Sequence, residues 1–320
     1  MKVLGIESTA HTLGIGIVKD GEVIANEKSI LFEYGIHPRK TADHHADQFN
    51  IVLNTALEKA GLGIEDIDLV SFSQGPGIGP CLRISSIAAR AFNIEYKKPV
   101  VGVNHCVAHI EISKHFTRFE DPLVLYVSGG NTQVIIKEKN RYHVLGETLD
   151  VGIGNMLDTF ARSAGLKNAR DVEEKAKNGN KYIPLPYSVK GMDASFSGIL
   201  TYSEKLIGKE KIEDICFSLQ ETAYASLCEI TERALALTGK SEITICGGVA
   251  QNKRLQGMLS QIADDWNCRF GVAPNEYNAD NGGMIAYLGY LVAKRKIKKH
   301  FLTAERIVPK PKYRTEEFTI

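Results

Sequence analysis

The amino-acid sequence predicts a duplicated α/β fold, in which two similar halves each contain an open sheet with loops at the strand ends. Three observations support this prediction. A strand-turn-strand pattern occurs twice, roughly 120 residues apart. Strands alternate with helices after each copy, and several strands end in loops rich in Gly, Ser, Thr and Asn. Because open α/β sheets bind ligands at the carboxyl ends of their strands, these loops form the predicted binding region.

The two strand pairs share the same kind of polar tip. Apolar runs in residues 3–18 flank a tip at 8–12, and apolar runs in residues 123–136 flank a tip at 128–132. A single strand pair of this kind is common among proteins. The repeated chemistry of the tip is what indicates duplication.

In the first half, the remaining elements follow a β-α-β order. After the first strand pair the sequence predicts a helix, a strand that runs into a loop rich in Gly and Pro, a second helix and a further strand. They lie at residues 43–61, 69–73, 81–96 and 99–103, with the loop at 74–80.

The second half repeats this order more loosely. A helix is followed by a loop-rich stretch that continues to about residue 200, a long amphipathic helix, a buried strand, another helix and an extended tail. The five regular segments lie at residues 155–164, 212–237, 242–246, 282–294 and 309–314. Gly239 is suited to end the long helix, because glycine readily adopts the left-handed conformation found there.

Composition excludes several classes of protein. With 320 residues, 43% of them hydrophobic, the chain is large enough for two domains, yet no run approaches the roughly 20 apolar residues of a membrane helix. The six cysteines form no CxxC pair, which favours a reducing, cytoplasmic location over a disulfide framework or a zinc knuckle. The 39 basic and 38 acidic residues nearly balance, so strong unaided binding of nucleic acid is not expected. A solvated helix end and a phosphate contact explain the basic run at residues 294–300 equally well.

Two glycine-rich loops are candidates for a nucleotide site. Residues 128–132 and Gly247-Gly248 each follow a strand, and glycine lets main-chain N–H groups approach phosphate oxygens closely. A tight turn alone explains either loop taken singly, whereas both loops in related places of a duplicated chain favour a nucleotide. No P-loop competes, because Ala234 stands where that motif requires its first glycine.

His105 and His109 are candidate metal ligands. If the chain is helical here, the two side chains lie one turn apart on the same face, where both can bind one ion. Cys106 occupies the position at which the zinc-protease motif places its glutamate. Further ligands are expected from Tyr126 and Asp280, which lie at element ends. The alternatives are packed core histidines, a strand aromatic and a helix N-cap.

Seven motifs, taken together and in order, resemble the tRNA threonylcarbamoyladenosine transferase family, also called TsaD or Gcp. The sequence around His105, Asn104-His105-Cys106, resembles that of the family's archaeal and eukaryotic branch, whose members are the catalytic subunit of the KEOPS complex. The motifs are Glu7-Ser8-Thr9-Ala10-His11-Thr12, Ser73-Gln74-Gly75-Pro76-Gly77, Gly102-Val103-Asn104-His105-Cys106-Val107-Ala108-His109, Tyr126-Val127-Ser128-Gly129-Gly130-Asn131-Thr132, Gly152-Ile153-Gly154-Asn155, Gly247-Gly248-Val249-Ala250 and Asp280-Asn281-Gly282.

The resemblance implies a fold and an activity. The fold is the duplicated actin/hexokinase/Hsp-type (ASKHA) fold, with two similar halves around a nucleotide cleft, here at residues 1–120 and 121–300, followed by a tail at 301–320. The activity is transfer of a threonylcarbamoyl group from threonylcarbamoyl-AMP to the N6 amine of the tRNA adenosine next to the anticodon, in tRNAs that read codons starting with adenine. The alternatives are a metalloendopeptidase, a sugar-kinase-like ATPase and a nucleotide-binding scaffold without catalysis.

The resemblance also implies site residues, cofactors and partners. One metal ion, with iron favoured and zinc possible, is bound by His105, His109, Tyr126 and Asp280. The adenylate or an ATP-type nucleotide contacts Tyr126, Val127, Ser128, Gly129, Gly130, Asn131, Asp158, Glu173 and Asn252. The partners are tRNA and KEOPS-type subunits, namely a small protein kinase, a dimerising subunit and a small regulatory subunit, with no membrane partner. One region departs from the family, because a glycine-containing loop before Glu173 is shortened and Ala169 stands nearest to the missing glycine.

Overall fold

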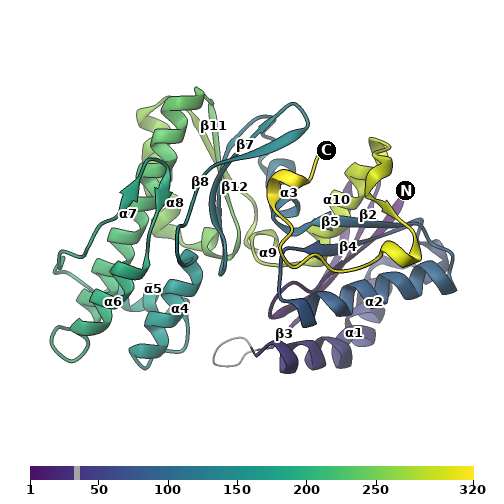
Figure 1. Ribbon diagram of the computed structural model, residues 1–320, viewed down its shortest axis with the longest axis horizontal. Helices are drawn as coiled ribbons and strands as arrows, with labels where there is room; N and C mark the ends of the chain where they lie inside the picture. The colour runs from purple at the N-terminus through teal and green to yellow at the C-terminus, as the bar shows by residue number, and fades with distance from the viewer. Residues whose placement is uncertain (32–36) are drawn as a thin grey trace. The chain divides into compact units, whose positions relative to one another are not determined.

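The computed structural model describes residues 1–31 and 37–320, which fold into two compact units (Figure 1). Unit 1 comprises Met1–His115, Glu138–Tyr142 and Pro274–Ile320, and unit 2 comprises Phe116–Lys137 and His143–Ala273. Within the described residues, no helix combines the length and the apolar character needed to cross a bilayer.

Unit 1 is built on a sheet with strand order β13-β5-β4-β1-β2-β3, in which β1, β4 and β5 are parallel. Figure 1 shows α1 and α2 on one face of this sheet and α10 on the other. The strands are β1 (Lys2–Glu7), β2 (Thr12–Lys19), β3 (Glu22–Ile30), β4 (Leu69–Gly75), β5 (Val100–Asn104) and β13 (Phe301–Leu302). The helices are α1 (Pro38–Ala60), α2 (Gly79–Glu95), α3 (His105–Thr117), α9 (Asn275–Asn278) and α10 (Gly282–Lys294).

The central strands of this sheet are buried because helices cover both of its faces. β4 and β5 are buried at every residue, as expected for parallel strands with helices on both sides. Their side chains join those of β1, β2 and α1 in one apolar core that includes Leu4, Ile15 and Phe72.

Helix α10 packs on β1 and β2 with almost no side chains in between. A Cβ at Gly16 would lie 2.2 Å from the main-chain nitrogen of Gly283, and one at Gly5 would lie 2.2 Å from that of Ala286. Strand and helix backbones are therefore in direct contact, which only glycine permits. Pro274–Ile320 belong to unit 1, whereas the second half predicted from the sequence extends to residue 300 and the predicted tail covers 301–320.

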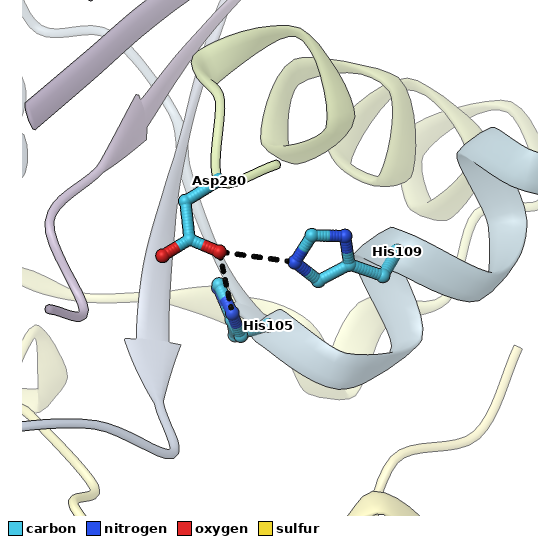
Figure 2. A group of neighbouring side chains, drawn as sticks. All are labelled: His105, His109 and Asp280. Atoms are coloured by element: carbon cyan, nitrogen blue, oxygen red, sulfur yellow. Dashed lines mark hydrogen bonds and ion pairs between the residues drawn. The ribbon is translucent and has the colours of Figure 1, made fainter. Parts of the chain in front are cut away.

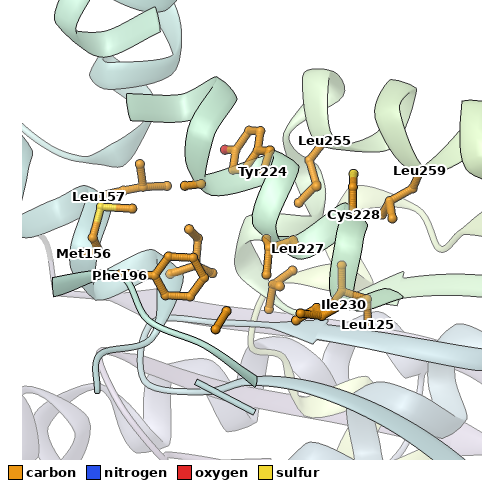
Figure 3. Packing of buried hydrophobic residues seen from close by; sticks show 14 of the residues in the cluster. Leu125, Met156, Leu157, Phe196, Tyr224, Leu227, Cys228, Ile230, Leu255 and Leu259 are labelled. Carbon is orange, nitrogen blue, oxygen red and sulfur yellow. The ribbon is translucent and has the colours of Figure 1, made fainter. Parts of the chain in front are cut away.

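Unit 2 is built on a sheet with strand order β12-β11-β6-β7-β8, in which β6, β11 and β12 are parallel. A large apolar core joins α7 and α8 to this sheet, with Leu227, Leu255 and Leu125 among its members (Figure 3). The strands are β6 (Leu123–Val127), β7 (Thr132–Glu138), β8 (Arg141–Glu147), β9 (Val189–Lys190), β10 (Asp193–Ala194), β11 (Glu242–Cys246) and β12 (Arg269–Val272). The helices are α4 (Ile153–Ser163), α5 (Ala169–Ala176), α6 (Ser197–Leu206), α7 (Ile212–Thr238) and α8 (Lys253–Asp265).

The two sheets have the same topology. The strand order β5-β4-β1-β2-β3 in unit 1 matches the order β12-β11-β6-β7-β8 in unit 2. In each unit the first two strands along the chain, β1 and β2 or β6 and β7, pair antiparallel. The predicted duplication is confirmed. The boundaries of its halves, at residues 120 and 300, stay a prediction.

Several elements differ from the sequence prediction. The stretch before residue 200, expected to be loop-rich, contains α5 and α6, and the third strand of each sheet, β3 or β8, was not predicted. Helix α1 begins at Pro38, a residue type favoured in the first helical turn, five residues before the predicted start at Asp43.

Candidate metal site and nucleotide-binding loops

The histidine pair lies where β5 ends and α3 begins. β5 ends at Asn104 and His105 is the first residue of α3, so His105 and His109 lie one helical turn apart on the same face. His105 is 5% exposed and His109 is fully buried. Two buried imidazoles on one helix face need polar partners, and both find one in Asp280.

Asp280 comes to the pair from the segment before α10. Its Oδ1 lies 3.2 Å from Nε2 of His109 and 3.5 Å from Nε2 of His105 (Figure 2). Asn281 fixes the following turn, because its side chain caps α10 by accepting from the main-chain N–H of Met284. The position of Asp280 is thus set by the packing of α10 on β1 and β2.

Glu7, at the end of β1, orients His105. Nδ1 of His105 donates to Oε2 of Glu7 across 3.0 Å, and the main-chain N–H of Thr9 donates to the other carboxylate oxygen, at 2.6 Å. A hydrogen bond at Nδ1 leaves Nε2 of His105 directed toward Asp280. Carboxylate-histidine pairs of this kind hold metal-binding imidazoles in proteins.

The buried charges shift the pKa values of this group in opposite directions. Burial opposes a charge on His105, but the Glu7 and Asp280 carboxylates outweigh it and raise the pKa of His105 to about 9. Burial lowers the pKa of His109, and the charge on His105 lowers it further. The pKa of Asp280 lies below its usual range because the two histidines outweigh the effect of burial.

The donor atoms fit a metal ion. Within residues 1–31 and 37–320, one group of His, Cys, Asp or Glu side chains could hold a metal ion. It consists of His105, His109 and Asp280, whose ligand atoms all lie within 4.8 Å of one another. Two imidazole nitrogens and one carboxylate oxygen suit zinc and iron, and they leave further positions for other ligands. Three of the four predicted ligands thus come together in unit 1.

Tyr126, the fourth predicted ligand, belongs to unit 2. It is fully buried near the end of β6, where it is paired with Cys246 of β11. Its ring also lies against Gly247, since a Cβ at that glycine would be 3.2 Å from Cε2 of Tyr126. Its role as a metal ligand stays a prediction.

The turn at residues 128–131, which joins β6 to β7, packs against the start of α4. The main-chain N–H of Gly154 donates to the carbonyl of Ser128 at 3.1 Å, and that of Asn155 donates to the carbonyl of Gly129 at 3.0 Å. A Cβ at Gly152 would lie 2.4 Å from the carbonyl oxygen of Gly129. The glycines before and within α4 therefore allow a helix N-terminus to touch the turn, and Gly129 and Gly130 remain exposed. Helix N-termini beside glycine-rich turns are typical sites for phosphate.

The second glycine loop contacts the same strand end. Gly247 has a φ of 97°, and a Cβ there would lie 2.3 Å from the carbonyl oxygen of Val127. The two loops predicted from the sequence, at residues 128–131 and 247–248, are therefore neighbours at one edge of the unit 2 sheet.

The other predicted nucleotide contacts, Asp158, Glu173 and Asn252, also lie in unit 2, on or next to its helices. Asp158 is on α4 and its Oδ1 accepts from the main-chain N–H of Ala169, at 2.8 Å, so it fixes the start of α5. Glu173 lies on α5, half-buried. Asn252 caps α8 by accepting from the N–H of Leu255. Contacts of these three residues with a nucleotide stay a prediction.

Glu7 was not among the site residues predicted from the sequence. The residue stood within the first quoted motif, but its partner His105 is 98 positions away. The available signal was a carboxylate between the two apolar runs of residues 3–18, because a buried charge requires a specific partner.

The model of the TsaD family, tRNA N6-adenosine threonylcarbamoyltransferase, matches residues 21–287. The chain is 52% identical to the tRNA N6-adenosine threonylcarbamoyltransferase of Thermococcus kodakarensis and 49% identical to that of Archaeoglobus fulgidus, over 100% of this chain and 99% of each relative. It is also 49% identical to a probable bifunctional tRNA threonylcarbamoyladenosine biosynthesis protein of Methanocaldococcus jannaschii, over 99% of this chain and 59% of that protein.

Solved structures show the fold. The chain is similar to HypF of Thermococcus kodakarensis (TM-score 0.68, 14% identity, 92% of this chain and 48% of that one). It is also similar to component A of the (R)-2-hydroxyglutaryl-CoA dehydratase of Acidaminococcus fermentans (TM-score 0.58, 18% identity, 92% and 99%). The predicted ASKHA-type fold is confirmed. From the extent of the sequence matches, the chain belongs to the tRNA N6-adenosine threonylcarbamoyltransferase (TsaD) family of transferases.

Proposed function

We propose that this chain transfers the threonylcarbamoyl group from threonylcarbamoyl-AMP to the N6 amine of the adenosine next to the anticodon, in tRNAs that read codons starting with adenine. The observation that carries the proposal is the buried group of His105, His109 and Asp280, found in a chain about half identical to named transferases over its whole length.

The reaction is an acyl transfer to a weak nucleophile. The N6 nitrogen attacks the carbonyl carbon of the mixed anhydride, a C–N bond forms, and the C–O bond to phosphate breaks with its electron pair leaving on AMP. The amine loses one proton. Because the anhydride is already activated, positioning and charge stabilisation contribute more than a strong base.

The metal ligands in this proposal are His105, His109, Asp280 and Tyr126. Iron is favoured and zinc is the alternative, since imidazole, phenolate and carboxylate ligands suit both. The bound ion supplies positive charge that offsets the charge developing on the leaving adenylate. Glu7 keeps the Nδ1 proton of His105 in place, so that Nε2 is the atom available for ligation.

The adenylate lies at the two glycine loops of unit 2. The exposed main-chain N–H groups of Gly129 and Gly130 bind phosphate, and the start of α4 holds this turn in place by donating to its carbonyls. Gly247 brings the second loop close to the end of β6, where it packs against the carbonyl of Val127. The further proposed contacts come from side chains on α4, α5 and the start of α8, which are Asp158, Glu173 and Asn252.

The proposed partners are tRNA and the KEOPS-type subunits, a small protein kinase, a dimerising subunit and a small regulatory subunit, acting in the cytoplasm. The chain's formal net charge is +1, so it contributes little general attraction to a polyanion. Subunits that supply positive charge would account for tRNA affinity.

A reconstituted transfer assay tests the proposal. With partner subunits, tRNA and threonylcarbamoyl-AMP supplied, His109→Ala is expected to abolish modification of the adenosine, as measured by nucleoside analysis. His115→Ala is the matched control, because His115 lies on the same helix outside the three-residue group and should leave transfer intact. Normal modification by a folded, metal-free His109→Ala protein would refute the metal role.

The alternatives make different predictions. A metalloendopeptidase needs a general base beside the histidines, and Cys106, at its motif position, is buried. A sugar-kinase-like ATPase would hydrolyse ATP with a small substrate and would not require His105. The similarity to transferases favours neither alternative.

A further inference from the structure

We propose that Asn104 and the C-terminal segment at residues 309–320, here called the strap, jointly set the position of the metal-binding helix α3. Asn104 is a positioning residue in this proposal, and the strap is part of the metal site's support. The inference rests on the metal site of the proposed function.

Asn104 joins the strap to the first turn of α3 with one side chain. Its Oδ1 accepts from the main-chain N–H of Val107 at 3.1 Å, which caps the helix that begins at His105. Its Nδ2 donates to the carbonyls of Tyr313 and Arg314, at 3.1 and 3.2 Å. Asn104 is fully buried, so water does not replace these bonds readily.

The strap is anchored on both sides of this contact. The main-chain N–H of Lys310 donates to the carbonyl of Gln74 at 2.6 Å, and that of Ile320 donates to the carbonyl of Asn140 at 3.1 Å. Tyr313 is 5% exposed and Phe318 is fully buried. The strap is therefore held to the rest of unit 1 by these two hydrogen bonds and by the buried side chains of Tyr313 and Phe318, so the carbonyls that face Asn104 have defined positions.

The chemistry of asparagine suits this double contact. An amide side chain offers an acceptor and two donor hydrogens on adjacent atoms, which neither aspartate nor serine does. His105 follows Asn104 directly, so a shift of the amide moves the first metal ligand with it. Metal affinity responds to the partners that hold its ligands, commonly by about 10- to 100-fold when one is removed.

Substitutions at Asn104 separate its cap from its contact with the strap. Asn104→Asp keeps an oxygen that caps α3 and has no donor for the strap, whereas Asn104→Ser keeps a capping oxygen and replaces the two N–H donors with a single O–H on that same atom. Asn104→Ala removes the cap and the donors. If the strap contributes to the metal site, all three variants lose metal affinity; if only the cap matters, Asp and Ser behave like the parent.

The experiment is a titration of the metal-free, full-length protein with Co²⁺, monitored by its visible absorption in competition with a chelator. We expect Asn104→Asp and Asn104→Ser to bind Co²⁺ about tenfold or more weakly than the parent, with altered band positions. Asn93→Ser is the matched control, because Asn93 also donates from Nδ2 to a main-chain carbonyl, that of Lys98, away from α3. It should bind as the parent does.

Tyr313→Ala changes the strap and leaves Asn104 intact. This variant provides the test if circular dichroism shows that the Asn104 variants are unfolded. Weakened Co²⁺ binding supports the proposal. Parent-like affinity and spectrum in Tyr313→Ala, or in folded Asn104→Asp and Asn104→Ser, overturns it. A failure of the proposed metal site itself would give a different result. In that case Co²⁺ binding by the parent would be absent or would not change in His109→Ala.

Discussion

Glu7 connects the first strand to the metal-binding helix through a single hydrogen bond to His105. The carboxylate is fully buried, and it fixes which imidazole nitrogen carries the proton. Metal binding by His105 depends on which ring nitrogen carries the proton, since an imidazole binds a metal only through a nitrogen without a proton.

Substitution Glu7→Gln is expected to weaken metal binding. A glutamine NH₂ at this position donates to Nδ1 and moves the imidazole proton to Nε2, the atom that faces Asp280. We expect Zn²⁺ affinity to fall by about 10- to 100-fold, measured by competition with a chelator. The exposed Glu95→Gln should not change the affinity. An unchanged affinity in Glu7→Gln would show that Glu7 does not set the tautomer.

The raised pKa of His105 predicts a pH dependence of the metal-free protein. The pKa is about 9 in the fold and about 6.5 in an unfolded chain. The protonated form is therefore favoured by folding: its contribution to the free energy of unfolding is complete below about pH 6.5 and disappears as pH rises through about 9.

Urea unfolding of metal-free protein at several pH values measures this contribution. The parent should lose more stability than His105→Gln between pH 6.5 and 9. Metal binding should show the opposite trend and strengthen over this range, because the ion displaces the proton. Parallel pH profiles for parent and variant would contradict the assignment.

At the scale of elements, glycine lets α10 lie on the β1-β2 pair, and this contact brings Asp280 to the histidines. Gly14, Gly16 and Gly282 all lie where a Cβ would meet main-chain atoms of the facing element at less than 3.0 Å. At these three glycines the nearest atoms belong to main chains, which cannot yield as the end of a flexible side chain can.

Substitution Gly16→Ala is expected to destabilise the protein by about 1–3 kcal/mol, through overpacking between backbones. It should also weaken metal binding, because α10 must shift and Asp280 moves with it. Gly257→Ala on α8 is the matched control: a Cβ there meets nothing within 4 Å, and alanine favours the helix. Thermal unfolding and Zn²⁺ titration measure both effects. A Gly16→Ala protein with parent-like stability would refute the close contact.

The contact between α4 and the turn at 128–131 predicts an effect on nucleotide binding. Gly152→Ala would push α4 away from Gly129 and Gly130, so the turn whose N–H groups are proposed to bind phosphate would shift. We expect AMP affinity to fall roughly tenfold, equivalent to about 1.4 kcal/mol, by calorimetry. Gly198→Ala on α6, where the Cβ would make only an ordinary contact with Cβ of Pro186 at 4.0 Å, should leave AMP binding intact. Equal AMP affinity in both variants would exclude the turn as the phosphate site.

At the scale of the whole molecule, the proposed ligands belong to two units. Three lie in unit 1, and Tyr126 lies in β6 of unit 2. Binding of one ion would then slow hydrogen exchange in both, since a ligand protects the structure that holds it.

Hydrogen exchange with and without Zn²⁺ tests this prediction. Protection is expected near His105, near Asp280 and in β6. In Tyr126→Phe, which lacks only the hydroxyl, protection should be confined to unit 1. Protection confined to unit 1 in the parent would remove Tyr126 from the ligand set.

The sequence predicted the duplication and most strands because apolar runs with polar tips are local signals. It missed β3, whose nine residues include only one that is buried, and the short helix α6, which begins in the stretch expected to be loop-rich. His105 and His109 were candidates from their spacing alone. The contact of Glu7 with His105, and the return of α10 to β1, depend on residues far apart in sequence, for which no local pattern exists.

The return of Pro274–Ile320 to unit 1 has a consequence for biosynthesis. Residues 1–115 are made first, but Asp280, the glycines of α10 and the strap follow only after Phe116–Lys137 and His143–Ala273 of unit 2. At roughly 5–20 residues per second, the nascent first unit waits several seconds or more for its closing helix. Until then the glycine-lined surface of β1 and β2 lacks the helix that covers it, and metal loading through all three side chains becomes possible only after Asp280 has been made.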